Sequence, residues 1–236
     1  MLVLECHPKL VSKHPMRTDA QPSDADLPTR MFDDEIWLNL TAPLKHQLDS
    51  GAVVAVDESM VNKCVNVLRW DGRGWWCAGV DGEGVVDALH HHGIEAKEHV
   101  LGLVGGGGAA RSTAAAWIAA GGRLQQLPSK RLLEDGSWSK GITDEAPTVF
   151  VDFDGTLEGK ADAICLNSSY NPMKGSVDER VAAIMQNGLD GRWLLVAQHL
   201  ACWRRLWAPE RAGDLPDLGL LLTRLLEAEC VLSSYA

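Results

Sequence analysis

Residues 99–127, HVLGLVGGGGAARSTAAAWIAAGGRLQQL, place four consecutive glycines between an apolar segment and an alanine-rich one. The apolar run 99–104 predicts a strand, residues 109–120 predict a helix, and residues 123–127 predict a second strand. A flexible linker would have polar flanks without strand character, whereas this run follows a strand directly and enters a helix. Strand, helix and strand in this order predict parallel pairing in an α/β fold.

Within the glycine run, Gly105, Gly107 and Ala110 form the pattern G-x-G-x-x-A, which binds dinucleotides where a strand turns into a helix. The first glycine allows the tight turn, the second lets the backbone approach a pyrophosphate, and the small third residue lets the helix pack on the strand. Free N–H groups at the helix start would then meet a phosphate. We therefore predict that Gly105, Gly107, Gly108 and Ala109 hold a pyrophosphate; a purely structural turn is the alternative.

The second strand of this unit runs into LPSKR, residues 127–131, where NAD-binding proteins often carry an acidic residue. This segment has no carboxylate, and Ser129, Lys130 and Arg131 offer a hydroxyl and two cations. Such groups suit a 2′-phosphate, so the sequence favours NADP over NAD. NAD, or a merely solvated basic turn, remains the alternative.

Further elements follow from apolar patterning and turn residues. Residues 36–40 predict a strand, residues 63–82 a β-hairpin turning at Asp71-Gly72, and residues 83–93 a helix ending at Gly93. Residues 15–35 are expected to form a loop and residues 43–60 a helix. Strands are predicted at 148–153 and 162–168, and helices near 176–187, 197–207 and 217–229.

The composition limits the partners and the compartment. The formal charge of −10 over 236 residues makes nucleic acid and anionic lipid poor partners. No apolar run is long enough to cross a membrane, and the start lacks a basic secretory leader. The six cysteines form no C-x-x-C pair, so we expect a reduced, cytoplasmic chain.

Six segments in order resemble the shikimate dehydrogenase family, whose members include shikimate and quinate dehydrogenases. They are NLTAPLK (39–45), NKCVNVL (62–68), GVDGEG (79–84), GGGGAARS (105–112), LNSSYNPM (166–173) and LLVAQHLACWRRLW (194–207). Each segment alone is weakly specific, but six at family-like spacing cover most of the chain.

The resemblance implies two α/β domains with a substrate cleft between them. Residues 1–82, completed by C-terminal helices from 196–236, would bind substrate, and residues 83–195 would form a Rossmann-like NADP-binding domain. The implied activity is an NADP-dependent oxidoreductase that interconverts a cyclic hydroxy acid and its keto form, as in aromatic amino acid biosynthesis. The shikimate/3-dehydroshikimate pair, or a close analogue, would be the substrate.

The resemblance also implies roles for individual residues. Lys45 and Asp81 would be the catalytic pair, because the alkoxide that forms when a ketone accepts hydride needs a proton and a nearby cation. The alternative is that neither residue has a catalytic role: Lys45 would be a surface lysine and Asp81 a turn residue. The other implied residues are Thr41, Asn66 and Gln198 for the ring hydroxyls and Asn167 and Met173 for the cofactor.

The N-terminal part departs from the family pattern. In HPKLVSKHP (7–15), Ser12 and His14 would hold the substrate carboxylate, and His14 stands where the family has a second serine. The chain between Pro15 and Asn39 is also shorter than in the family, by about one helix-and-strand unit. We therefore expect one face of the first sheet to lack cover and hypothesise a homodimer that covers it.

Other signals compete with this interpretation. VFVDFDGTL (149–157) resembles the nucleophile motif of haloacid-dehalogenase phosphatases, in which Asp152 and Asp154 would act with magnesium. A regulatory, non-catalytic relative that binds a nucleotide or acid is a further alternative. The histidines of HHHG (90–93) are expected to be structural rather than metal ligands, and Trp203 and Trp207 to pack in the core.

Overall fold

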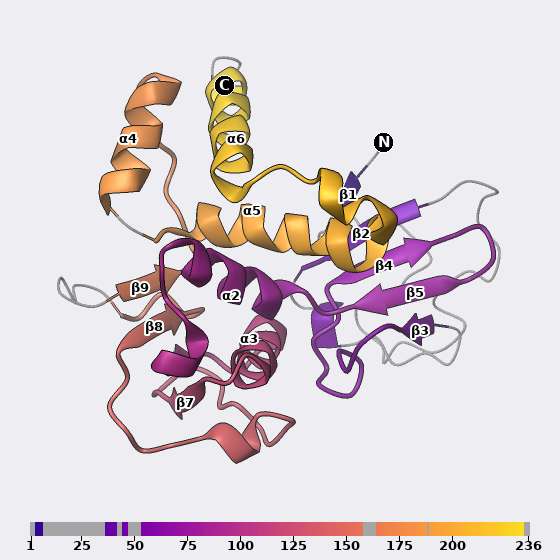
Figure 1. The fold of residues 1–236 in the computed structure, drawn as a ribbon, viewed down its shortest axis with the longest axis vertical. Coiled ribbons are helices and arrows are strands. Elements are labelled where there is room, and N and C mark those ends of the chain that lie inside the picture. Colours follow the sequence, from indigo (N-terminus) through magenta and orange to yellow (C-terminus); the bar gives the residue numbers. More distant parts are fainter. Residues whose placement is uncertain are drawn as a thin grey trace.

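The structure, a computed structural model, describes residues 3–6, 36–41, 44–46, 53–157, 164–187 and 189–233. Two separate β-sheets are joined by long helices (Figure 1). The first sheet comes from the N-terminal third of the chain, and the second comes from the middle of the sequence. The predicted loop 15–35 lies outside the described residues.

The first sheet has the strand order β1-β2-β4-β5-β3. Its strands are β1 (Val3–Cys6), β2 (Ile36–Leu40), β3 (Val53–Ala55), β4 (Val67–Trp70) and β5 (Trp75–Ala78). β4 and β5 pair antiparallel as the predicted hairpin, with Gly72 at a φ of 85° in the turn. Asp71 stabilises that turn, because its Oδ1 accepts hydrogen bonds from the backbone N–H groups of Arg73 and Gly74.

The described residues within 43–60 do not form the expected helix. The described part of that range contains only a short 3₁₀ turn, η2 (Leu44–His46), followed by strand β3. β3 pairs parallel with β5, with Val53 opposite Trp75 and Ala55 opposite Cys77. The prediction was wrong because pairing with a strand some twenty residues later overrides a weak local helix preference.

The second sheet is wholly parallel, as the sequence predicts. Its strand order is β7-β6-β8-β9. Its strands are β6 (Val100–Val104), β7 (Arg123–Gln126), β8 (Val149–Asp152) and β9 (Ile164–Asn167). Helix α3 (Gly108–Ala119) connects β6 to β7 and begins inside the glycine run. Short 3₁₀ turns lie before β6 and between β7 and β8, namely η3 (Ala96–Glu98) and η4 (Ser139–Gly141).

Two helices bridge the sheets. Helix α2 (Asp81–His91) leaves the first sheet and packs on both α3 and α5 (Gly191–Cys202) (Figure 1). Gly82 permits this packing, because a β-carbon there would overlap the Ser112 carbonyl group of α3. Gly84 does the same on the other side, where a β-carbon would come 2.7 Å from the Gln198 backbone nitrogen of α5.

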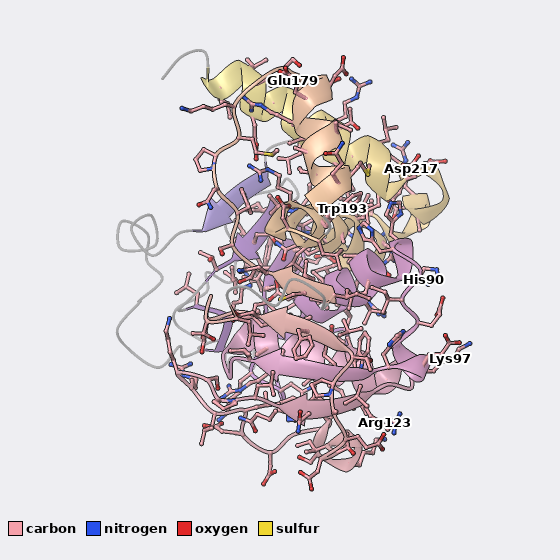
Figure 2. The ribbon with its side chains drawn as sticks, turned by 90° about the vertical axis from the view of Figure 1, so that its left-hand side faces the viewer. His90, Lys97, Arg123, Glu179, Trp193 and Asp217 are labelled. Carbon is pink, nitrogen blue, oxygen red and sulfur yellow. The ribbon has the colours of Figure 1, made fainter. Side chains whose placement is uncertain are left out.

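The C-terminal elements cover the first sheet and then leave it. A π-helical turn, η5 (Trp203–Trp207), continues α5, and its Trp203 and Trp207 pack against Trp37 of β2 as predicted. The chain then forms η6 (Pro209–Asp214) and α6 (Leu218–Ser233), which lies beside α4 (Val177–Asn187). Trp193 of α5 lies between this helical layer and the parallel sheet (Figure 2).

Both faces of the first sheet carry buried side chains. One face packs against η5, and the other buries Leu68, Trp70 and Cys77, which are at most 2% exposed within the single chain. The uncovered face that motivated a homodimer is therefore not found among these residues. Self-association remains a prediction that the single chain does not test.

Candidate active site

Lys45, Asp81 and Asn66 form a buried polar cluster at the edge of the first sheet. The Lys45 Nζ atom lies 2.7 Å from Oδ2 of Asp81, and Asn66 donates from Nδ2 to Oδ1 of the same carboxylate at 3.0 Å. Asp81 and Asn66 are 2% and 1% exposed, whereas the lysine side chain is 15% exposed. The ammonium group is therefore the most exposed member of the cluster.

Backbone bonds fix the position of this cluster. Asn66 precedes β4; its carbonyl accepts from Leu40 of β2 and its N–H donates to Ala78 of β5. Its side-chain oxygen accepts from the Val80 N–H at 2.7 Å, which leaves the amide nitrogen aimed at Asp81. Asp81 is the first residue of α2, a position where the helix dipole favours a carboxylate.

The glycine run brings the second sheet against the same cluster. Gly105 adopts a φ of 125°, which only glycine tolerates well, and turns the chain from β6 toward α3. Gly108 lies so close to Lys45 that a β-carbon there would be 2.8 Å from the lysine β-carbon. The start of α3 and the lysine are therefore direct neighbours.

The start of α3 meets the requirements of a phosphate site. Its N-cap, Gly107, has no side-chain cap hydrogen bond, and a β-carbon there would meet nothing within 4 Å. The first N–H groups of a helix have no partner in the helix itself, so this open end can accept an anion. These features fit the pyrophosphate of a dinucleotide cofactor.

The segment after β7 carries an acidic neighbour that the local sequence conceals. Asp154, which follows β8, accepts from the Lys130 N–H at 2.7 Å, and its carbonyl accepts from the Lys130 ammonium at 3.0 Å. Ser129 donates to the carbonyl of Arg131 at 2.6 Å. The segment 127–131 itself has no carboxylate, but Asp154 reaches it from the loop after another strand, β8.

Asp152 shows why its motif does not form a phosphatase centre here. Its two carboxylate oxygens accept four backbone N–H groups, from Asp154, Gly155, Thr156 and Leu157, at 2.6–2.9 Å. The residue is fully buried. A carboxylate with its lone pairs taken in this way anchors the loop after β8 and is not placed as a nucleophile. No metal-ligand cluster is found among the described residues.

The other predicted site residues are placed as follows. Thr41 is half-buried and follows β2, and Gln198 is half-buried on α5, where its backbone touches Gly84. Asn167 ends β9 and accepts from the N–H and hydroxyl of Ser169. Met173 packs against the core of α4, α5 and α6. Ser12 and His14 lie outside the described residues.

A hydrogen-bonded chain through His199 was not predicted. Its Nδ1 lies 2.9 Å from the Leu195 carbonyl, so Nδ1 carries the proton and Nε2 accepts from the Asn39 amide at 3.4 Å. The Cys202 thiol donates to the Asn39 oxygen at 3.6 Å. The sequence offers no signal for this contact, because Asn39 and His199 are 160 positions apart.

The buried thiols are chemically quiet. Burial raises the pKa of Cys64 to about 12, with a further contribution from the Asp81 carboxylate, and burial also raises the pKa of Cys77 to about 12. Burial raises the pKa of Cys202 well above its ordinary value. None of these residues is a thiolate nucleophile near neutral pH.

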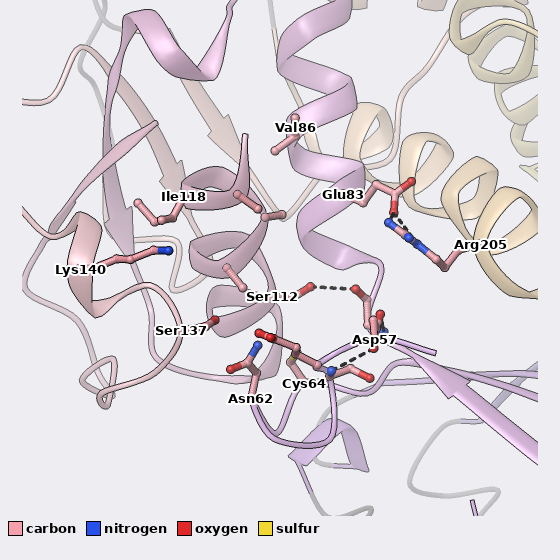
Figure 3. A pocket seen from close by; sticks show the side chains of 16 residues that line it. Asp57, Asn62, Cys64, Glu83, Val86, Ser112, Ile118, Ser137, Lys140 and Arg205 are labelled. Atoms are coloured by element: carbon pink, nitrogen blue, oxygen red, sulfur yellow. Dashed lines mark hydrogen bonds and ion pairs between the residues drawn. The ribbon is translucent and has the colours of Figure 1, made fainter. Parts of the chain in front are cut away.

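A cavity of about 460 Å³ opens on another side of the α2–α3 contact (Figure 3). Asp57, Asn62, Ser112, Lys140 and Arg205 are among its lining residues, and none of the predicted site residues lines it. It touches the cluster only indirectly, because Ser112 accepts a hydrogen bond from the Gly82 N–H, one residue after Asp81. Its location therefore does not define the chemistry of the site.

The fold and the cluster define a two-sheet α/β protein with a Rossmann-like half, in which a buried lysine–aspartate pair adjoins the glycine turn. No protein-family model matches the chain. Among curated proteins, the shikimate dehydrogenases (NADP(+)) of two Halobacterium salinarum strains are 28% identical over 203 residues, covering 74% of this chain and 75% of theirs. The chain is therefore similar to the shikimate dehydrogenases over about three quarters of its length.

Solved structures support the same fold. A shikimate 5-dehydrogenase from Thermus thermophilus, in complex with NADP(H) and shikimate, aligns with a TM-score of 0.56 at 21% identity. Shikimate dehydrogenase 1 from Peptoclostridium difficile aligns with a TM-score of 0.56 at 14% identity. Each alignment covers 82% of this chain and 78% of the other. No helix among the described residues is long and apolar enough to cross a membrane.

Proposed function

We propose that the chain is an NADP-dependent oxidoreductase that interconverts a cyclic hydroxy acid and its keto form, shikimate and 3-dehydroshikimate or a close analogue. One observation carries the proposal: the Lys45–Asp81 pair, 2.7 Å apart, adjoins the open start of α3 through Gly108. The curated relatives carry the name of NADP-dependent shikimate dehydrogenases, which supports both the cofactor and the reaction class.

Lys45 and Asp81 supply the proton chemistry in this proposal. NADPH, when bound, provides the hydride that converts the ketone to an alcohol. The Lys45 ammonium, the accessible member of the pair, donates a proton to the oxygen that gains negative charge and stabilises that charge. Asp81 holds the ammonium in place and accepts a hydrogen bond from a hydroxyl of the substrate. In the reverse direction, the pair removes the hydroxyl proton.

Substrate contacts are proposed around this pair. Asn66 donates one amide N–H to Asp81, and we propose that its second N–H donates to a ring hydroxyl. Thr41 and Gln198, at the end of β2 and on α5, are proposed to bind the other hydroxyls. Ser12 and His14 are proposed to bind the substrate carboxylate.

Cofactor contacts are proposed along the carboxyl edge of the parallel sheet. Gly105, Gly107, Gly108 and Ala109 would receive the pyrophosphate at the start of α3. The other proposed contacts are Asn167 and Met173 and, toward the 2′-phosphate, Ser129, Lys130 and Arg131. The Lys130 ammonium donates to the backbone carbonyl of Asp154, and the Asp154 carboxylate accepts the Lys130 backbone N–H, so a phosphate there has a carboxylate as a neighbour.

The proposal also assigns the two parts of the chain to substrate and cofactor. Residues 1–82 with 196–236 are proposed as the substrate-binding unit and residues 83–195 as the cofactor-binding unit. With this activity, the protein would act in the cytoplasm, in aromatic amino acid biosynthesis. Sedimentation of the purified chain tests the homodimer.

The experiment that tests the function follows absorbance at the reduced-nicotinamide wavelength with shikimate, quinate and related cyclic acids, each with NADP and NAD. Wild-type protein is expected to turn over at least one acid with NADP. Lys45→Met should lower kcat roughly a hundredfold or more while the acid still binds, whereas Lys97→Met, at an exposed lysine outside the cluster, should not. Wild type that binds an acid but turns over none would favour a regulatory protein instead.

A further inference from the structure

A buried arginine lies away from the catalytic cluster without an anionic partner. Arg180, on the first turn of α4, is 5% exposed, and its Nε donates to the Gly175 carbonyl at 3.0 Å. Among the described residues, no carboxylate oxygen lies within 4.0 Å of its guanidinium group. A buried cation is costly unless it is paired, so this group calls for an anion.

The stability of α4 does not explain the position of Arg180. A cation in the first turn of a helix opposes the helix dipole. The helix start is already satisfied by a capping box, because the Ser176 hydroxyl accepts from the Glu179 N–H and the Glu179 carboxylate accepts from the Ser176 N–H at 2.7 Å. The guanidinium contacts the helix start through one bond, from Nε to the Gly175 carbonyl, and this bond does not account for its terminal nitrogens.

The side chain of Arg180 lines a cavity of about 250 Å³ between α4, α6 and the loop after β9. Only its Nε is hydrogen-bonded to a described residue, and its two terminal nitrogens are not fully enclosed. The other lining residues are Tyr170, Pro172, Met173, Arg192, Glu229 and Leu232.

The carboxylates beside the cavity are held by Arg192 and not by Arg180. Arg192 donates from Nε to both oxygens of Glu229 at 3.0 and 3.1 Å, and from Nη1 to Asp190 at 3.0 Å. Arg192 is thus paired with two carboxylates, Glu229 and Asp190, and neither of them forms an ion pair with Arg180. The Glu229 carboxylate does not repel an incoming anion strongly, because Arg192 already neutralises it.

We propose that this cavity is a binding site for a small oxyanion, the carboxylate or phosphate group of a compact molecule, held by the terminal nitrogens of Arg180. The planar guanidinium can offer its two terminal nitrogens to either group, since only Nε is used by the Gly175 carbonyl. A volume of about 250 Å³ is too small for a dinucleotide. Neither Lys45 nor Asp81 lines the cavity, so the proposal does not rest on the proposed enzyme activity.

An anion in this cavity would connect α4 to α5, α6 and the loop after β9. Arg192 donates to the Asn171 carbonyl at 2.9 Å and lies 4.5 Å from the Tyr170 ring centre, which connects the loop after β9 to α5 and α6. An anion on Arg180 adds α4 to this assembly. Binding should therefore stabilise the α4–α6 layer as well as occupy the cavity.

Titration calorimetry with inorganic phosphate, and separately with succinate, tests the site. Wild type should bind at least one of the two, and the stronger ligand identifies the preferred source of the oxyanion. Arg180→Gln should weaken that binding roughly tenfold or more, whereas Arg211→Gln, at an exposed arginine outside the cavity, should bind as wild type does. No binding in wild type, or equal binding in Arg180→Gln, overturns the proposal.

Two further variants keep the test decisive if Arg180→Gln does not fold. Leu232 is 70% exposed at the cavity rim, so Leu232→Glu adds a negative charge without removing buried contacts and should weaken binding severalfold. Arg131→Gln removes a cation from the proposed cofactor site instead and should leave this binding unchanged. Binding that is lost with Arg131 and retained in Leu232→Glu assigns the anion to the cofactor site and overturns the proposal.

Discussion

Gly108 and Lys45 touch across the junction of the two sheets, and a β-carbon on Gly108 would lie 2.8 Å from the lysine β-carbon. This contact explains the fourth glycine of the run, which lies beyond what a dinucleotide turn requires. Any side chain at position 108 must displace the lysine that the proposed reaction depends on. The glycine run thus serves both the start of α3 and the position of the ammonium group.

Gly108→Ala should therefore lower turnover without unfolding the protein. The methyl group pushes Lys45 away from its place beside Asp81, and a misplacement of about 1 Å can cost roughly a hundredfold in rate. The measurement is kcat for the acid that wild type turns over. Gly213→Ala, where a β-carbon meets nothing within 4 Å, is the matched control and should keep the wild-type kcat. Equal rates in the two variants would contradict this role for Gly108.

Gly82→Ala should destabilise the fold itself. A β-carbon at this position overlaps the backbone of Ser112 and Thr113, so α2 and α3 must separate. We expect a loss of about 3 kcal/mol in the free energy of unfolding, at the upper end of overpacking costs. Urea denaturation measures it, with Gly213→Ala again as control. An unfolding midpoint that does not change would show that the helices can separate at little cost.

The parallel sheet and the hairpin could be predicted from sequence because their signals are local. Gly105 and Gly72 mark the turns that their backbone angles require, and the apolar runs beside them are short and bounded. The range 43–60 was predicted wrongly because Val53 takes its conformation from Trp75, a partner that no local window contains.

The contacts of the candidate site also join residues that are far apart in the sequence, so local patterns did not predict them. The pairing of Lys45 with Asp81 was anticipated through the family resemblance, since nothing local connects residues 36 positions apart. The contact between Asp154 and Lys130 was missed for the same reason, although both residues had been singled out separately. The bond from Asn39 to His199 depends on how α5 returns to the first sheet, which patterning does not encode.

Asp152→Asn should reduce stability. The carboxylate accepts four backbone N–H groups, and an amide nitrogen in place of one oxygen leaves two of those donors unpaired and facing it. The expected loss is about 2 kcal/mol in the free energy of unfolding. Asp144→Asn, at an exposed aspartate, is the control and should change stability by less than about 0.5 kcal/mol. Magnesium-dependent phosphatase activity in wild type that the Asp152 variant loses would instead favour the phosphatase interpretation.

The pH dependence of stability should carry a contribution from His92. Burial lowers the pKa of His92, and the neighbouring His91 lowers it further; the ring packs 4.7 Å from Trp193, centre to centre. Because the folded pKa lies below the unfolded value of 6.5, the unfolded chain binds the proton first as the pH falls. This contribution is therefore absent above pH 6.5 and destabilises the protein increasingly below it, until the folded pKa is reached. Urea unfolding at pH 7.5 and 5.5 should show a smaller loss for His92→Gln than for wild type, and His91→Gln should fall between them. Identical losses in all three proteins would exclude His92 as a source.

Asp154→Asn should increase the preference for NADP over NAD. The carboxylate accepts the Lys130 backbone N–H and repels an incoming 2′-phosphate, whereas asparagine still accepts that N–H but carries no charge. We expect the ratio of kcat/KM for NADP to that for NAD to rise roughly tenfold, mainly through KM for NADP. Asp144→Asn removes one negative charge elsewhere on the surface and should leave the ratio unchanged. If the ratio falls in Asp154→Asn, the Asp154 carboxylate helps to position Lys130 for the phosphate. That result would contradict the prediction that the carboxylate disfavours NADP.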